Sequence, residues 1–126
     1  MDPQNQAKKI LCIEDDHFIS ELYVRALEHE GFEVETAISG PEGLEKATSG
    51  DYDVIIIDIM LPDMLGTDVF PQIKQSTPKS KLVIATNLDL EDEKREKLQS
   101  QVDAYVIKAD ITPGKLVEIV TGLSKK

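Results

Sequence analysis

The stretch that decides the fold is Val54-Ile55-Ile56-Ile57-Asp58-Ile59-Met60-Leu61-Pro62-Asp63-Met64-Leu65-Gly66. Its first four residues are apolar and β-branched, which is typical of a central parallel strand buried on both faces. The run stops at the carboxylate of Asp58, and Pro62 and Gly66 then favour a loop. We therefore expect Asp58 at the carboxyl end of a strand, the edge at which open α/β sheets bind ligands.

The composition is that of one acidic globular domain. The chain has 126 residues, enough for a single core, and a formal net charge of −10 at pH 7. This charge argues against nucleic acid or an anionic membrane as a direct partner. No apolar run is long enough to span a bilayer, so we expect a cytoplasmic protein. The single cysteine, Cys12, lies within an apolar run and is expected to be a buried small hydrophobe.

Short apolar runs alternate with helical patterns along the rest of the chain. The expected strands cover residues 10–13, 32–36, 54–57, 82–86 and 104–108, and a helical pattern follows each of them. Because parallel neighbours require right-handed crossovers, this repeated strand-helix order predicts a single doubly wound parallel sheet with helices on both faces. Residues 1–7 are polar, and we expect them to form a disordered lead-in.

Two of the expected helices have weak points. Pro71 cannot donate a backbone hydrogen bond, so we expect the helix after Gly66 to start late or to bend at Phe70 and Pro71. The helix that follows the fourth strand has no apolar residue from Glu91 to Lys97. It should be the least firmly held element.

Polar residues follow four of the strands at the carboxyl edge of the predicted sheet. Glu14 and Asp15 end the first strand, Asp58 the third, Thr86 the fourth and Lys108 the fifth. If the first and third strands are neighbours, their three carboxylates repel one another unless a cation lies among them. Mg2+ fits best, because it accepts one or two carboxylates and leaves positions for water and phosphate oxygens.

The lysine and the hydroxyl at this edge suit a phosphoryl group. Lys108 can neutralise the charge of phosphoryl oxygens, and Thr86 can orient them. The chemistry implied is attack by a carboxylate oxygen of Asp58 on phosphorus, which gives an aspartyl phosphate.

With these residues in view, the chain resembles the receiver domains of response regulators in two-component signalling. The resemblance covers about residues 8–123 and is carried by Glu14-Asp15, the stretch from Asp58 to Pro62 with Gly66, Thr86, Tyr105 and Lys108. It implies a flavodoxin-like receiver fold whose five strands have the order 2-1-3-4-5, in a receiver domain of residues 8–124.

The resemblance also implies the roles of the acidic residues. Asp58 would accept a phosphoryl group from a histidine kinase or phosphotransfer protein. Asp15, Asp58 and the backbone carbonyl of Met60 would bind Mg2+, with Glu14 acting directly or through water. The protein would then be no turnover enzyme, since it would catalyse only its own phosphorylation and dephosphorylation.

Further roles follow from the same resemblance. Lys108 and Thr86 would bind phosphoryl oxygens, and Thr86 and Tyr105 would form a switch pair. Phosphorylation would thereby shift the face formed by the fourth helix, fifth strand and fifth helix, which would control an output protein or domain.

The sequence departs from the family pattern at several positions. Receiver domains usually have proline after the lysine, in a cis peptide, whereas this chain has Ala109, for which we expect a trans bond. Asn87 replaces a small residue after the threonine and is expected to narrow access to the phosphate. Met60 and Leu88 occupy the two positions that, in the family, flank the route of the attacking water molecule. Both residues are apolar here, which predicts slow autodephosphorylation.

Two other classes of function compete with the phosphoacceptor switch. Ala109 and Asn87 favour a phospho-independent interaction module of receiver fold. A turnover enzyme, either a flavodoxin-like reductase or an aspartate-nucleophile phosphatase, is disfavoured. The first strand is not followed by a hydroxyl- and glycine-rich phosphate loop, and no second Asp stands two residues beyond Asp58.

Overall fold

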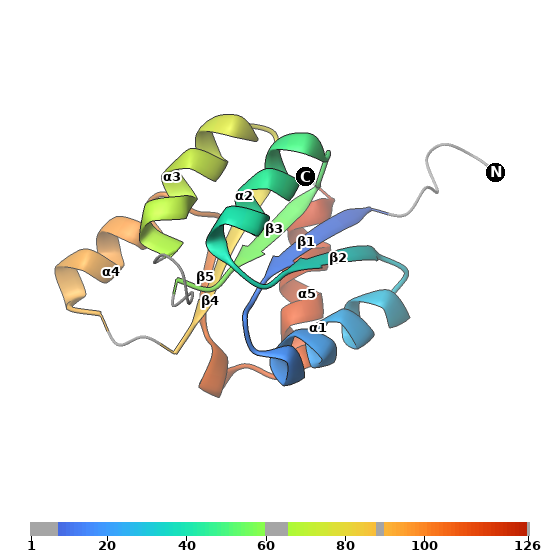
Figure 1. The fold of residues 1–126 in the computed structure, drawn as a ribbon. Coiled ribbons are helices and arrows are strands. Elements are labelled where there is room, and N and C mark those ends of the chain that lie inside the picture. The colour runs from blue at the N-terminus through green and yellow to red at the C-terminus, as the bar shows by residue number, and fades with distance from the viewer. Residues whose placement is uncertain (1–7, 60–65, 88–89, 126) are drawn as a thin grey trace.

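The computed structural model describes residues 8–59, 66–87 and 90–125, in which five strands alternate with five α-helices (Figure 1). The strands are β1 (Lys9–Ile13), β2 (Glu33–Ala37), β3 (Val54–Ile57), β4 (Lys81–Thr86) and β5 (Ala104–Ile107). The helices are α1 (His17–His29), α2 (Gly40–Ser49), α3 (Gly66–Ser76), α4 (Asp92–Gln99) and α5 (Pro113–Ser124), and the short 3-10 helix η2 (Lys108–Asp110) joins β5 to α5. The lead-in expected for residues 1–7 lies outside the described residues.

The five strands form one parallel sheet in the order β2-β1-β3-β4-β5. This confirms the expected doubly wound fold and its strand order. The register pairs Ile13 with Ile57, Ile57 with Ile84, and Thr86 with Ile107. The carboxyl ends of the strands therefore meet at one edge, where the polar residues of the sequence follow them.

Helices cover both faces of the sheet, α1 and α5 on one and α2 and α3 on the other (Figure 1). Strand β3 explains why the central run is apolar throughout, because its successive side chains enter opposite cores. Ile55 and Ile57 pack with α2 and α3, whereas Val54 and Ile56 pack with α1 and α5. Cys12 is buried in the second of these cores, as expected, and burial raises the pKa of its thiol to about 12.

Glycine and capping residues mark where three of the helices end or begin. After α1, Gly31 has a φ of 100°, a conformation that suits glycine. Ser39 caps α2 by accepting from the Glu42 amide, and the Glu42 side chain accepts in return from the Ile38 amide at 2.7 Å. Thr112 caps α5 in the same way, by accepting from the Lys115 amide. These caps fix where each helix leaves the sheet edge.

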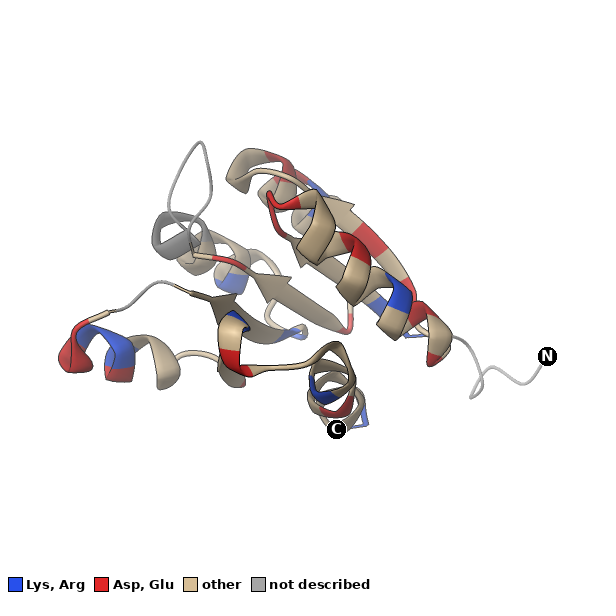
Figure 2. Cartoon of the chain, turned by 90° about the horizontal axis from the view of Figure 1, so that it is seen from below, with Lys and Arg blue, Asp and Glu red and all other residues tan. Residues whose placement is uncertain are grey.

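Helices α3 and α4 differ in how they are held. Of the two outcomes expected for α3, the late start is wrong, since the helix begins at Gly66 and continues through Pro71, and the bend at Phe70 and Pro71 stays a prediction. Complete burial of Phe70 and Ile73 against the sheet offsets the lost hydrogen bond. By contrast, α4 has no buried residue and no side-chain hydrogen bond at its N-cap, and charged residues cover it (left in Figure 2). Among the described residues, no helix is long and apolar enough to cross a bilayer.

Candidate functional site

The strand ladder itself places two acidic residues side by side. Glu14 and Asp58 directly follow β1 and β3, whose last residues pair in the sheet. The Asp58 amide donates to the Ile13 carbonyl at 3.1 Å, and the Glu14 amide donates to the Ala37 carbonyl at 2.9 Å. Backbone bonding thus continues past the ends of the strands. Both side chains are buried: Glu14 is 3% exposed and Asp58 is 4% exposed.

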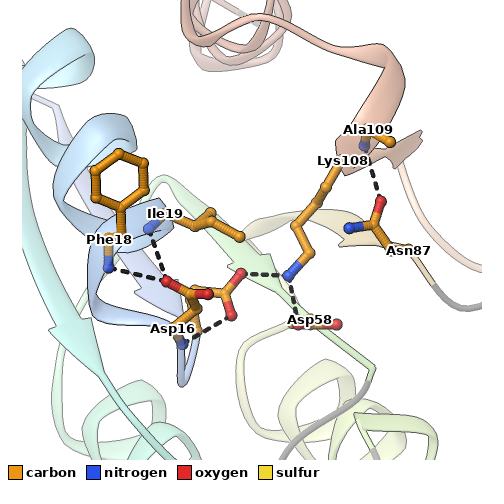
Figure 3. Close-up of polar contacts among 8 residues, drawn as sticks. Asp16, Phe18, Ile19, Asp58, Asn87, Lys108 and Ala109 are labelled. Carbon is orange, nitrogen blue, oxygen red and sulfur yellow. Dashed lines mark hydrogen bonds and ion pairs between the residues drawn. The ribbon is translucent and has the colours of Figure 1, made fainter.

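Lys108 brings a cation to these two carboxylates. Its Nζ lies 2.6 Å from Oε1 of Glu14 and 2.6 Å from Oδ2 of Asp58 (Figure 3). The lysine side chain is only 8% exposed, so both ion pairs are shielded from water. Hydrogen bonds between charged groups are short and strong in such surroundings. The expected meeting of the first, third and fifth strands at one point is therefore present.

One ammonium group does not balance these carboxylates. Burial raises the pKa of Glu14 to about 7, and the negative charge of Asp58 adds to this, against the lowering effect of hydrogen bonds from Lys108 and the Asp16 amide. Burial acts to lower the pKa of Lys108, but its hydrogen bonds to Asp58 and Glu14 outweigh burial and raise it. Two buried carboxyl groups therefore share one ammonium group, which favours a proton or a further cation beside them.

A third acidic residue completes a set of oxygens that fits a divalent cation. Glu14, Asp15 and Asp58 each offer one carboxylate oxygen, and these atoms lie within 4.8 Å of one another. Asp15 is exposed, which leaves the cluster open to solvent on its side. A hard cation with oxygen ligands, such as Mg2+, suits this donor set and its excess of negative charge. Met60, expected to add its carbonyl, lies outside the described residues.

The next acidic residue, Asp16, has a different role. Its Oδ1 accepts from the Phe18 amide at 2.9 Å and the Ile19 amide at 3.1 Å, so Asp16 caps helix α1 (Figure 3). Its own amide donates to Oε2 of Glu14 at 3.1 Å. Asp16 therefore orients Glu14 and begins the helix, a role that sequence reasoning missed although an Asp before a helical pattern is a cap signal.

The two expected switch residues lie on neighbouring strands. Thr86 is the last residue of β4 and is fully buried. Tyr105 lies in β5 opposite Ile84, and its hydroxyl oxygen is shielded from solvent. Thr86 thus shares the carboxyl edge with the acidic cluster, as predicted.

The turn after β5 contains a contact that sequence reasoning missed. No cis peptide occurs among the described residues, so the bond between Lys108 and Ala109 is trans, as expected. The Ala109 amide donates to Oδ1 of Asn87 at 2.8 Å (Figure 3). The two departures from the family pattern at this edge are therefore bonded to each other. Leu88, the other apolar residue noted there, lies outside the described residues.

Comparison with known proteins identifies the family of this chain. A family model for the response regulator receiver domain matches residues 10–121. Response regulator ArlR of Staphylococcus saprophyticus is 36% identical over 100 residues, which cover 79% of this chain and 45% of that protein. The chain thus spans less than half the length of this relative.

Solved structures show the same fold. A CheY-like response regulator receiver domain protein from Methanospirillum hungatei has a TM-score of 0.87 and 31% identity, with 94% of each chain covered. Response regulator protein TrrA from Thermotoga maritima, solved with Mg2+ and BeF, has a TM-score of 0.79 and 34% identity over 92% of this chain and 98% of its own. The family model matches nearly the whole chain and the solved structures share its fold, so this protein belongs to the response regulator receiver domain family.

Proposed function

We propose that residues 8–124 form a phosphoacceptor switch in which Asp58 accepts a phosphoryl group from a histidine kinase or phosphotransfer protein. The observation that carries the proposal is the buried Asp58 carboxylate held 2.6 Å from the Lys108 ammonium, within a cluster of three acidic residues. The Lys108 ammonium offers this carboxylate a charge-assisted hydrogen bond, and a carboxylate oxygen is the nucleophile that formation of an aspartyl phosphate requires.

The proposed transfer forms one bond and breaks one. A carboxylate oxygen of Asp58 attacks phosphorus, the bond between phosphorus and the donor histidine nitrogen breaks, and that nitrogen leaves with the electron pair. Lys108 neutralises charge on the phosphoryl oxygens, and Thr86 donates a hydrogen bond to one of them. The protein would act on itself only and would not turn over a substrate.

Glu14, Asp15 and Asp58 are the side chains that would hold Mg2+, together with the carbonyl of Met60. When bound, the ion would supply the positive charge that the cluster lacks and would neutralise phosphoryl oxygens. Because burial favours a proton on Glu14, this residue would have to lose that proton to act as a ligand.

Signalling would follow from a change in the contacts of Lys108. Because this ammonium now bonds both Glu14 and Asp58, a phosphoryl group on Asp58 must rearrange its ion pairs. Thr86 and Tyr105 would move as a pair. Their movement would shift the face of α4, β5 and α5 toward the arrangement that binds an output protein or domain. A nearly complete shift between two states needs about 5.5 kcal/mol of differential stabilisation. The weakly anchored α4 makes such a shift easier.

A phospho-independent interaction module is the second candidate. The observation that favours it is the trans turn at Ala109, which differs from the usual receiver turn and carries the lysine. In that role the ion pairs of Lys108 would be structural only.

Either role would place the protein in the cytoplasm. Its net charge of −10 argues against direct contact with nucleic acid or membrane.

Titration with beryllofluoride and Mg2+ separates the two candidates. Beryllofluoride mimics a phosphoryl group on an aspartate, so a phosphoacceptor should show amide shift changes in NMR spectra around Asp58 and across α4, β5 and α5. The Asp58→Asn variant serves as the control and should give no such response. A wild-type protein that gives no response either would be the interaction module.

A further inference from the structure

We propose that Asn87 is a positioning residue for Lys108, because its side-chain amide holds the turn that carries the lysine. The functional value of this role rests on the proposed function. The positioning itself concerns only the ion pairs of Lys108, which can be measured without a phosphoryl donor.

Only the backbone that precedes Lys108 is held by pairing in the sheet. Thr86 and Ile107 are the last registered pair of β4 and β5, and the chain then turns through η2. Within the turn, the Ile111 amide donates to the Lys108 carbonyl at 3.4 Å, which is long for a hydrogen bond. The bond from the Ala109 amide to Asn87 is 2.8 Å, an ordinary strong length. The bond between Ala109 and Asn87 is therefore the stronger restraint on the backbone that follows Lys108.

The position of this restraint makes it specific to Lys108. Ala109 directly follows the lysine, so fixing its amide fixes the peptide through which the chain leaves Lys108 (Figure 3). Asn87 directly follows Thr86, at the end of a central buried strand. The bond thus ties the lysine turn to the end of β4. A lysine stem is flexible, and the ion pairs that it makes at 2.6 Å depend on where its backbone begins.

The residue types fit this role. A proline at position 109 would have no amide hydrogen to donate, whereas Ala109 does. The Asn87 side chain supplies an acceptor from the next strand along the sheet. Both residues are exposed, so loss of the bond leaves an amide that water can satisfy. The bond should therefore matter more for the position of Lys108 than for the stability of the fold.

Four variants in two matched pairs test the proposal. Asn87→Ala removes the acceptor, and Asn87→Asp keeps it. Ala109→Pro removes the donor, and Ala109→Ser keeps it. The readout is the rate at which the Lys108 ammonium protons exchange with water, measured by 15N NMR at one fixed pH without metal or phosphoryl donor. Exchange at this buried group reports how tightly its two ion pairs are closed.

We expect Asn87→Ala and Ala109→Pro each to speed this exchange about two- to tenfold, the factor that corresponds to one ordinary hydrogen bond. Asn87→Asp and Ala109→Ser should stay close to wild type. The double variant should exchange no faster than the faster single variant, because both changes remove the same bond. If Ala109→Pro does not fold, Asn87→Ala and Asn87→Asp decide the question between them.

A folded Asn87→Ala variant whose Lys108 ammonium exchanges at the wild-type rate would overturn the proposal. If that variant also accepted phosphate from acetyl phosphate faster than wild type, Asn87 would restrict access to the site and would not position the lysine. A wild-type protein that fails to respond to beryllofluoride would refute the proposed function, which the exchange measurement does not depend on.

Discussion

The Nζ atom of Lys108 lies 2.6 Å from Oδ2 of Asp58, although 50 positions separate the two residues in the sequence. The parallel register of β3, β4 and β5 brings them together at the carboxyl edge. The same ammonium bonds Glu14, so Lys108 bridges the ends of β1 and β3. The ion pairs of Lys108 therefore involve the same carboxylates in the stability of the protein and in its proposed chemistry.

Lys108→Ala should destabilise the protein by about 3 kcal/mol, since it leaves two buried carboxylates without their cation. Urea unfolding measures this loss, and Mg2+ should restore more stability to the variant than to the wild type. Lys115→Ala is the control, because Lys115 pairs with Glu118 at 3.2 Å where their side chains are 63% and 70% exposed. It should change stability by less than about 1 kcal/mol. Equal effects of the two substitutions would count against a structural role for the buried pairs.

The pH dependence of stability should carry a contribution from Glu14. Its pKa rises from 4.5 to about 7 on folding because of burial, so the folded state holds a proton that the unfolded state has lost. The unfolding free energy of wild type should therefore fall, relative to that of Glu14→Gln, as the pH rises from 4.5 through 7. Urea unfolding of both proteins across this range, without metal, gives the difference. If the unfolding free energy of wild type instead rose with pH relative to that of Glu14→Gln, the fold would stabilise Glu14 as the anion.

Asp15→Asn should weaken Mg2+ binding by about tenfold or more, with little change in stability because the residue is exposed. Asp16→Asn removes the same charge from the adjacent position but keeps a good helix cap, so it should retain most of the affinity. Magnesium titrations followed by NMR compare the two variants. Similar losses in both would mean that general negative charge, and not ligation by Asp15, governs binding.

Helix α4 should open more readily than the other helices. It has no buried residue and no side-chain cap, whereas α5 buries Leu116, Val117 and Val120. Amide hydrogen exchange in the native protein should therefore be faster in α4 than in α5. Protection of α4 equal to that of α5 would rule out a weakly held helix as the mobile part of the switch.

Phosphorylated protein should lose its phosphoryl group slowly. Met60 and Leu88 are apolar, and neither can orient an attacking water molecule by a side-chain hydrogen bond. The decay of the aspartyl phosphate in magnesium buffer, followed by intact mass, measures the rate. A half-life of seconds or less would contradict this prediction, and Met60→Asn should shorten the half-life if the apolar side chain is responsible.

The strands, the helices and the parallel sheet could be predicted from the residues, because those signals were local and repeated. The β-branched run of residues 54–57 specified a doubly buried strand, and the acids and the lysine after successive strands had to meet once those strands were parallel. The strand order came from the family resemblance. The late start expected of α3 was wrong because the cost of Pro71 was weighed without the burial of Phe70 and Ile73, which only the packed structure shows.

The sequence could not show which polar atoms bond one another at the site. Asn87 and Ala109 were each recognised as unusual, but their bond joins positions 22 apart and depends on the path of one turn. The role of Asp16 in orienting Glu14 likewise depends on backbone geometry at the helix start. Such contacts are set by fractions of an ångström, a scale that residue patterns do not encode.

The most direct test of the central claim is intact-mass spectrometry after treatment with acetyl phosphate and Mg2+, with Asp58→Asn as the control. We expect the wild-type chain to gain the mass of one phosphoryl group, located at Asp58 by peptide mapping, and the variant to gain none. A wild-type chain that stays unmodified, or a variant that is modified equally well, would contradict it.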